Sequence, residues 1–292
     1  NEIKNKIIDN EIYSKVKDYS KERNTVITYY EIGRLLNEAG GKYGDNIINE
    51  YSKKLVIDVG KKYNRRTLFR MRQFYNVFSN EKVSTMSTQL TWSHYTELLP
   101  IKDINKLFYY LNISIKQNID VRGLRNKIKS NEYERLDEST KNKLINNEKS
   151  NIIDNIKNPI LIKNSNNYEE ISEKILQKLI LEDISTFMKE LGNHFSFIDN
   201  EYKIKIGNRY NYIDLLLFNI QYNCYVVVEL KVTELKKEHI GQIQFYMNYI
   251  DNNLKTINQE KTIGVIICKK GNKYVIEYCS DKRIVARYYE LV

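Results

Sequence analysis

The sequence predicts a two-domain protein of the α+β or α/β class, in which an all-helical N-terminal domain precedes a mixed α/β sandwich. The first half carries apolar residues at three- and four-residue steps, which is the period of amphipathic helices. The second half holds short apolar runs bounded by turn residues and rich in branched side chains, a pattern typical of buried strands. A chain of 292 residues can form two separate cores, and we place the domains at residues 1–150 and 165–292.

Glycines and capping residues mark the helices of the first domain. Gly40 and Gly41 are expected to end the first helix and Gly60 the second, because glycine is common just after a helix. Asp45 and Asn64 are expected as N-caps of the second and third helices. The expected helices span residues 1–40, 45–59, 65–78, 104–111 and 121–136.

Basic charge is concentrated in the first domain. The net charge is +10, and residues 51–130 hold 16 basic and 5 acidic residues, whereas residues 151–292 hold 19 and 18. Two short helices followed by an arginine-rich helix indicate a helix-turn-helix, so we predict nucleic-acid binding here. The alternative is an ordinary amphipathic helix with solvated arginines. The candidate nucleic-acid-binding residues are Arg65, Arg66, Arg70, Arg72, Arg122 and Arg125.

The composition argues against several other classes of protein. No run approaches the roughly 18 apolar residues of a membrane span, and the N-terminus has no charged-then-apolar signal region. The three cysteines, Cys224, Cys268 and Cys279, have no paired spacing, and with three histidines in the chain a zinc site is not expected. We therefore expect a reduced, cytoplasmic protein without a membrane partner.

The second domain is expected to begin after a connection at residues 137–167, which is rich in Lys and Asn and has little periodicity. Helices are expected over residues 168–191 and 237–250. Gly207 and Asn208 predict a tight hairpin turn. The expected strands span residues 195–198, 202–206, 210–218, 225–230, 261–269, 274–278 and 284–289.

Three charged residues stand in or beside the most apolar strands of the chain. Asp214 lies in one strand, and Glu229 and Lys231 lie at the end of the next. Folding the two strands into a hairpin brings Asp214 roughly opposite Glu229, and Lys231 shares the face of Glu229 because side chains alternate along a strand. Buried charges are costly unless they have partners or a function. The pattern therefore predicts a metal-dependent phosphodiesterase centre.

This grouping suits the hydrolysis of a phosphodiester. Mg²⁺ prefers oxygen ligands and is usually held by one or two carboxylates, here Asp214 and Glu229, together with waters and substrate phosphates. Lys231 would position or help to activate the water and offset negative charge in the transition state. A Glu-x-Lys pattern alone is a weak signal, since the chain holds four, but only this one ends a buried strand that follows a buried Asp. The alternative is a salt bridge at a strand end.

Residues on the two flanking helices complete the predicted site. Gln242 and Tyr246 are four residues apart on one helix face, from which they could bind phosphate or orient Lys231; the alternative is a polar helix surface. On the preceding helix, Glu182 could reach a metal through water, and Glu190 is the competing choice.

These residues carry a resemblance to a known family. Asp214, Glu229-Leu230-Lys231 and Gln242-x-x-x-Tyr246 resemble the PDDEXK nuclease superfamily, including the Q-x-x-x-Y element of its RecB-like members. More closely, YIDLLLFN, CYVVVELKV, GQIQFYMNYID and TIGVIICK resemble the YhcG-type PDDEXK nucleases. The helical segments KYGDNIINEYSKKL, RRTLFRMRQFY, WSHYTELL and LRNKIKSNEYERL resemble the N-terminal domain of the same family. One departure is that Ile213 stands where the superfamily is named for a proline.

The resemblance implies a restriction-endonuclease-like α/β/α core, dependence on Mg²⁺ with Mn²⁺ able to substitute, and a role directed at DNA, in defence or in mobile-element biology. It also implies that Glu182 is preferred to Glu190 as the helix glutamate. We therefore expect a Mg²⁺-dependent endonuclease whose partner is double-stranded DNA. The alternatives are a catalytically silent DNA-binding or recruiting protein and an RNA- or structure-specific nuclease. A double-strand cut would favour a homodimer, although no heptad stretch predicts one.

Overall fold

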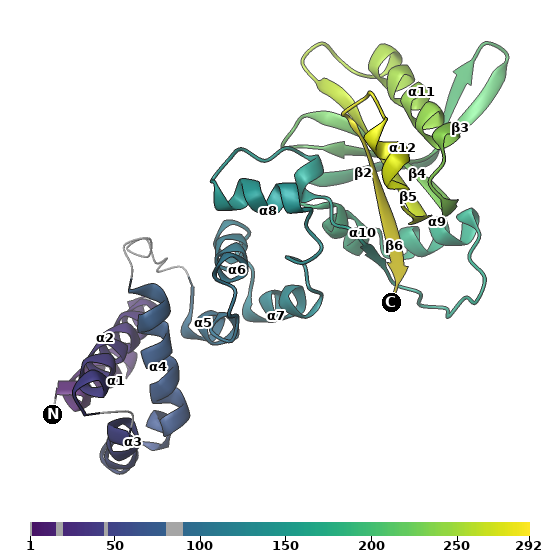
Figure 1. Ribbon diagram of the computed structural model, residues 1–292. Helices are drawn as coiled ribbons and strands as arrows, with labels where there is room; N and C mark the ends of the chain where they lie inside the picture. The colour runs from purple at the N-terminus through teal and green to yellow at the C-terminus, as the bar shows by residue number, and fades with distance from the viewer. Residues whose placement is uncertain (1, 16–19, 44–45, 80–89) are drawn as a thin grey trace. The chain divides into compact units, whose positions relative to one another are not determined.

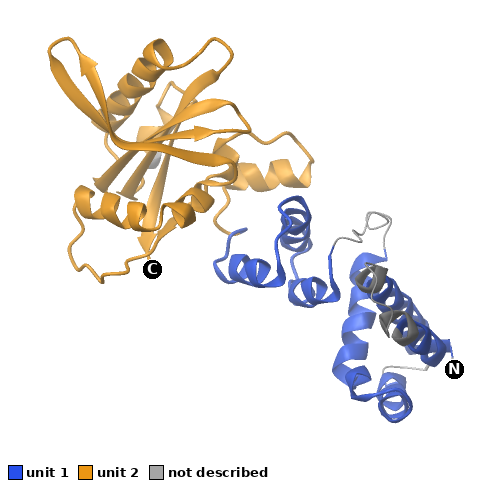
Figure 2. Cartoon of the chain, turned by 180° about the vertical axis from the view of Figure 1, so that it is seen from behind, with its two compact units in different colours: residues 1–133 blue, residues 134–292 orange. Residues whose placement is uncertain are grey.

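The computed structural model describes residues 2–15, 20–43, 46–79 and 90–292. The chain divides into two compact units, residues 1–133 and 134–292 (Figure 2), each with its own core. The first unit is helical and the second is built on a mixed sheet, as predicted; the sheet has six strands. Within the described part of the chain, no helix has the length and apolar character that a membrane span needs.

The first unit is built around two long helices, α2 and α4, whose apolar faces pack on each other (Figure 1). They approach closely at Gly33, where an added Cβ would lie 2.1 Å from the carbonyl oxygen of Met71. Glycine is therefore required at this crossing. The helices of this part are α1 (Glu2–Lys15), α2 (Ser20–Tyr43), α3 (Asn46–Asp58), η1 (Lys61–Tyr63) and α4 (Arg65–Phe78).

Helix α4 begins and buries its apolar face as the sequence predicted. Asn64 is its N-cap and accepts a hydrogen bond from the Thr67 backbone N–H at 3.2 Å. The buried face consists of Leu68, Met71, Phe74 and Phe78. Two other expectations differ. Helix α2 continues through Gly40 and Gly41 to Tyr43, since two glycines weaken a helix by only about 1 kcal/mol each, and the expected cap Asp45 lies outside the described residues.

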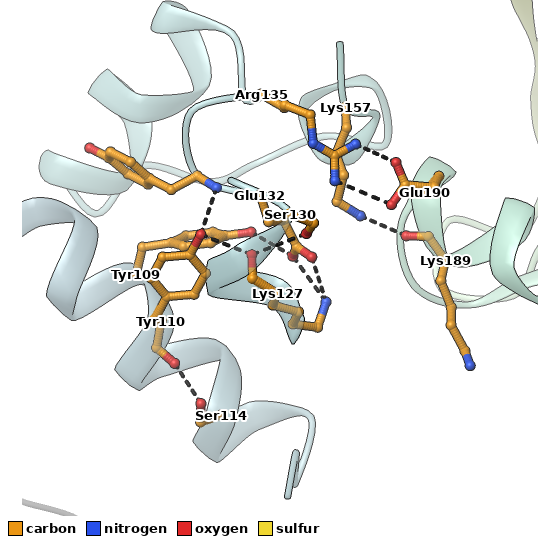
Figure 3. Close-up of polar contacts among 11 residues, drawn as sticks. Tyr109, Tyr110, Ser114, Lys127, Ser130, Glu132, Arg135, Lys157, Lys189 and Glu190 are labelled. Atoms are coloured by element: carbon orange, nitrogen blue, oxygen red, sulfur yellow. Dashed lines mark hydrogen bonds and ion pairs between the residues drawn. The ribbon is translucent and has the colours of Figure 1, made fainter. Parts of the chain in front are cut away.

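Three shorter helices follow, α5 (Trp92–Leu98), α6 (Ile104–Lys116) and α7 (Val121–Lys129). The expected helix over 121–136 stops at Lys129, because the chain turns at Asn131, which has a positive φ of 52°. Polar contacts hold this turn: Tyr109 and Lys127 both donate to the buried Glu132, at 2.9 Å and 2.8 Å (Figure 3). His94 has a structural role, because its ring bonds to Thr91 and to the Ile119 carbonyl.

The second unit contains one mixed sheet in the order β1-β6-β5-β4-β3-β2 (Figure 1). The strands β1, β6, β5 and β4 run parallel, and β3 and β2 are antiparallel to their neighbours. Their bounds are β1 (Ile160–Ile162), β2 (Phe195–Ile206), β3 (Arg209–Asn219), β4 (Cys224–Glu234), β5 (Glu260–Lys270) and β6 (Ile284–Leu291).

Helices cover both faces of the sheet, which gives an α/β/α arrangement. Helices α9 (Glu173–Glu182) and α10 (Ile184–Leu191) pack on one face, and α11 (Lys237–Asn253) and α12 (Lys273–Glu277) pack on the other. The single expected helix over 168–191 is broken at Asp183, whose backbone is not helical and whose side chain caps α10. The expected strand over 274–278 is α12, because Asn272 caps a helical turn there by accepting from Val275 N–H.

Residues 134–167, much of which was expected as a connection, form part of the second unit. They contain α8 (Glu138–Ile145), η3 (Ile153–Asn155) and β1, which pairs with β6. Buried Arg287 of β6 donates to Asp137 at 2.6 Å and to the Ile156 carbonyl at 3.0 Å. Long-range pairing holds this polar segment in place, and its own sequence gives no sign of that.

Strands β3 and β4 separate at one end of their pairing. Their pairing ends at Leu215 and Val228, although β3 begins at Arg209 and β4 continues to Glu234. Beyond this point β3 pairs with β2 alone, so residues 202–213 form a two-stranded arm that extends from the sheet (Figure 1). The predicted charged residues stand where the two strands part.

Candidate active site

The site begins at Asp214, which directly precedes Leu215, the β3 residue at which pairing with β4 ends. Its Oδ2 accepts a hydrogen bond from the Leu230 backbone N–H at 2.7 Å. The carboxylate thus bonds to β4 just beyond the end of the strand pairing. This contact confirms the predicted closeness of Asp214 to the Glu229–Lys231 segment.

Glu229 and Lys231 lie side by side on β4. The two residues are 1% and 9% exposed, and Lys231 Nζ donates to Glu229 Oε1 at 2.7 Å. The other oxygen, Glu229 Oε2, is buried and has no hydrogen-bond partner among the described residues. A buried carboxylate oxygen without a donor is costly, so the chemistry of this atom suits a cation.

The electrostatics of the cluster reflect an excess of buried negative charge. Burial, together with the charge of Asp214, raises the pKa of Glu229 to about 7 despite the bond from Lys231. Burial also raises the pKa of Asp214, opposed by the Leu230 N–H and by Lys231. Burial by itself would lower the pKa of Lys231, but its bond to Glu229 and the nearby carboxylates raise it. Lys231 is therefore an ammonium group at neutral pH and a donor, not a base.

The start of α9 contributes two residues that the sequence analysis missed. Glu173 Oε2 lies 3.6 Å from Lys231 Nζ, and the amide of Gln177 donates to the Asp214 carbonyl oxygen at 3.0 Å. The two are four residues apart on one helix face. The available signal was Ser172 as the N-cap of α9, with Glu173 and the buried Gln177 four residues apart after it, but the expected helix began too early to reveal this spacing.

Neither glutamate predicted on this helix lies at the cluster. Glu182 is exposed and accepts from the Asn166 amide at 3.2 Å. Glu190 forms a nearly buried ion pair with Arg135 (Figure 3). It also accepts a hydrogen bond from the Leu161 backbone N–H. The break at Asp183 starts a separate helix, and Glu190 there holds neighbouring segments of the second unit together.

Helix α11 presents the predicted pair Gln242 and Tyr246. Gln242 donates to the Tyr246 hydroxyl at 3.2 Å, and Tyr246 is 5% exposed. Burial raises the pKa of Tyr246, and the charges of Glu229 and Asp214 add to this effect, so its hydroxyl lies within their field. The Tyr246 hydroxyl is therefore within electrostatic range of the acidic cluster.

The predicted metal ligands can be tested against the described residues. There, no group of three or more His, Cys, Asp and Glu side chains has the geometry to hold a metal. A magnesium ion needs fewer protein ligands, because it keeps several waters and is usually held by one or two carboxylates. The pair Asp214 and Glu229 fits this requirement, and Glu229 Oε2 supplies a buried oxygen that lacks a donor.

The predicted nucleic-acid-binding arginines lie on α4 and α7 of the first unit. Arg65, Arg66 and Arg122 are exposed, and the Arg65 guanidinium lies over the Phe69 ring at 5.1 Å. Arg125 is held in an ion pair with Glu97 at 2.6 Å, and Arg70 lies close enough to lower the Glu97 pKa further. Arg72 contacts α2 at Gly40.

Each of the two units matches a family of known proteins. Residues 153–292 match the family model described as YhcG PDDEXK nuclease domain, and residues 5–135 match the DUF1016 N-terminal domain. The curated protein "Putative nuclease YhcG" of Escherichia coli (strain K12) is 25% identical over 294 residues, covering 84% of this chain and 76% of that protein.

Two solved structures are also similar. The crystal structure of a repair endonuclease from Pyrococcus abyssi is 18% identical, and the match covers 44% of this chain and 49% of that one. The protein in an EndoMS–dsDNA complex is 16% identical, and the match covers 44% of this chain and 48% of that one. Their TM-score of 0.30 establishes neither a fold nor an activity. The two family models, in contrast, account for nearly all of the sequence. The chain belongs to the YhcG-type PDDEXK nuclease family.

Proposed function

We propose that this protein is a divalent-metal-dependent endonuclease that hydrolyses phosphodiester bonds in double-stranded DNA. The observation that carries the proposal is the convergence of Asp214, Glu229 and Lys231, where one buried Glu229 oxygen has no donor among the residues that the structure describes. PDDEXK nucleases generally use divalent metal ions. Mg²⁺, with Mn²⁺ as a substitute, suits the all-oxygen ligand pair.

The residues of the site have distinct roles in this proposal. Asp214 and Glu229 would hold the ion, which supplies positive charge to the phosphate and favours ionisation of water. Lys231, kept protonated by Glu229 and Glu173, donates hydrogen bonds to the scissile phosphate and offsets its developing charge. Gln242 and Tyr246 provide further donors from α11 and orient the phosphate.

The first unit is proposed to bind the substrate. Its segment 51–130 carries 16 basic and 5 acidic residues, and Arg65, Arg66 and Arg122 are exposed on its helices. Such a surface favours phosphate contacts irrespective of base sequence. Insertion of α4 into a major groove, as in a helix-turn-helix, remains part of this proposal.

The test is cleavage of supercoiled plasmid, a linear duplex and single-stranded RNA by the full chain, with Mg²⁺, Mn²⁺ or EDTA. We expect metal-dependent cutting of both DNA substrates and its loss in Asp214→Ala and Glu229→Gln. Glu234→Gln is the matched control, because it removes a carboxylate from the exposed end of the same strand.

The outcomes separate the alternatives. Cleavage of RNA alone would contradict the proposed substrate but keep the catalytic site. Binding of DNA without any cutting by the wild type, unchanged in Asp214→Ala, would contradict the enzyme and favour a recruiting protein.

A further inference from the structure

The β2–β3 arm has an unusual composition for the second unit. Residues 202–212, YKIKIGNRYNY, contain three basic residues, three tyrosines and no acidic residue. Residues 151–292, including the arm, are close to neutral, with 19 basic and 18 acidic residues. The arm is therefore a local basic and aromatic element in a domain that has no general basic excess.

The two faces of the arm have different environments. Ile204 and Ile213 are fully buried in the cluster that includes residues of α11, so one face is anchored to the domain. The opposite face presents Lys203, Lys205, Tyr210 and Tyr212 to solvent, and the two tyrosines are 53% and 51% exposed. Strand alternation puts these four side chains together. The anchoring makes the exposed face a fixed surface.

Cross-strand pairing orders the exposed face. Lys203 is opposite Tyr212, and Lys205 is opposite Tyr210. The Lys203 ammonium lies 3.9 Å from the centre of the Tyr210 ring, and Lys205 lies at 6.0 Å from it. The rings thus hold the ammonium groups close to the surface, where no acidic residue of the arm neutralises them.

The exposed face leads to the acidic cluster. Asp214 follows Tyr212 by two residues on the same strand, and the charge of Glu201 acts on the pKa of Asp214 from the paired strand. With a rise of about 3.4 Å per residue, Tyr210 stands about 14 Å from Asp214 along the strand. That length is about four nucleotides of one DNA strand at 3.4 Å each.

We propose that this arm binds the substrate strand within about four nucleotides of the scissile phosphodiester. Lys203 and Lys205 contact its phosphates, while Tyr210 and Tyr212 contact sugar or base surfaces. The inference depends on the proposed function for the identity of the bond that is cut. Charge complementarity identifies the occupant as a nucleic acid, because the arm offers cations and aromatic rings and no carboxylate.

The experiment measures binding of a labelled DNA duplex to the full chain in EDTA, over about 50 to 200 mM salt. Each lost phosphate contact lowers the slope of log K against log salt by about 0.9. We therefore expect Lys203→Ala/Lys205→Ala to lower the slope by about two and to weaken binding by roughly tenfold at the lowest salt. Tyr210→Ala/Tyr212→Ala should weaken binding about fivefold or more, and Tyr210→Phe/Tyr212→Phe should restore most of it.

The matched control is Lys261→Ala/Lys282→Ala, which removes the same charge. Lys261 lies at the start of β5 and Lys282 just before β6. Both are exposed, and they lie at the end of the parallel strands that is far from Lys231. This variant should keep the slope to within about half a unit. The melting temperature of every variant is measured, and a value equal to that of the wild type excludes a folding defect.

The outcome also separates the arm from the proposed function, because cleavage with Mg²⁺ is measured on the same proteins. A lysine variant with wild-type slope and affinity, or one no different from Lys261→Ala/Lys282→Ala, overturns the arm proposal even if the wild type cuts DNA. A reduced slope supports the arm even if the wild type cuts nothing, in which case only the proposed nuclease function is contradicted.

Discussion

At the level of single residues, the clearest feature is a buried carboxylate oxygen that has no hydrogen-bond donor in the described part of the chain. This atom is Glu229 Oε2; Lys231 bonds to the other Glu229 oxygen, and the charge of Asp214 adds to burial in raising the Glu229 pKa. An arrangement of this kind is unfavourable in the free protein. A bound cation would remove the penalty, so the residues that suit catalysis are expected to reduce the stability of the metal-free protein.

A metal ion should therefore raise the melting temperature. At about 100 times its Kd, a ligand adds about 2.7 kcal/mol, which for a unit of this size corresponds to roughly 5 to 10 °C. We expect Mg²⁺ or Mn²⁺ to produce such a rise in far-UV circular dichroism melts. Asp214→Ala should abolish it and Glu234→Gln should keep it; an equal rise in Asp214→Ala would place the ion elsewhere.

Glu173 should matter more than Glu182. Glu173 lies 3.6 Å from Lys231, whereas Glu182 is exposed and bonds to Asn166. Residues that orient catalytic groups typically contribute 10- to 100-fold. We expect Glu173→Gln to lower kcat on the order of tenfold with little change in duplex affinity, and Glu182→Gln to cleave like the wild type. The reverse ranking would restore Glu182 as the helix glutamate.

At the level of elements, close approach of helices and divergence of strands determine where side chains meet. The pairing of β3 with β4 could be predicted, because the two apolar runs flank a short polar break. The point at which the strands separate could not be predicted, because it depends on where β3 stops pairing with β4 and continues to pair with β2 alone. Similarly, the apolar face of α4 was predictable, but its contact with Gly33 of α2 was not.

Gly33→Ala should destabilise the first unit. The added Cβ would lie 2.1 Å from the backbone oxygen of Met71, which cannot move without separating the helices, so we expect a loss of about 2 to 3 kcal/mol. The single tryptophan reports this core, because Trp92 contacts Tyr29 of α2 and Phe74 of α4. Urea unfolding followed by tryptophan fluorescence measures the change.

Gly40→Ala on the same helix is the control. There the added Cβ meets only the flexible guanidinium of Arg72 at 3.2 Å. Alanine favours a helix by about 1 kcal/mol over glycine, so this variant should be no less stable than the wild type. Equal destabilisation by both variants would show that helix propensity and not the crossing decides the effect.

At the level of the whole molecule, the boundary of the second unit sets what a truncation removes. Arg135 pairs with Glu190 and Asp137 with Arg287, so residues 134–150 supply partners to buried charges further along the chain. Breaking such pairs costs about 3 kcal/mol or more each. We expect residues 134–292 to fold cooperatively in urea titrations, and residues 151–292 to be much less stable.

The same truncation tests the proposed division of labour. Residues 134–292 should bind DNA far more weakly than the full chain yet retain most of its cleavage rate at saturating substrate. Binding by residues 134–292 as tight as that of the full chain would contradict a substrate-binding role for the first unit.

The sequence by itself determined the class of the protein and the centre of its site. Strand periodicity predicts the β3–β4 hairpin, and with it the grouping of Asp214, Glu229 and Lys231, because register within a hairpin depends on neighbouring residues. Helical spacing likewise predicts that Gln242 and Tyr246 share a face.

Only the tertiary structure decided which helix residues reach that centre, where the second unit begins, and which face of the arm is exposed. The sequence favoured Glu182, whereas the structure brings Glu173 to Lys231, because the start of α9 and the break at Asp183 depend on packing against the sheet. Residues 134–167 look like a linker, yet Asp137 and β1 are held by partners about 130 to 150 residues away. Contacts between segments so far apart leave no periodic pattern in either segment, since each depends on the position of the other.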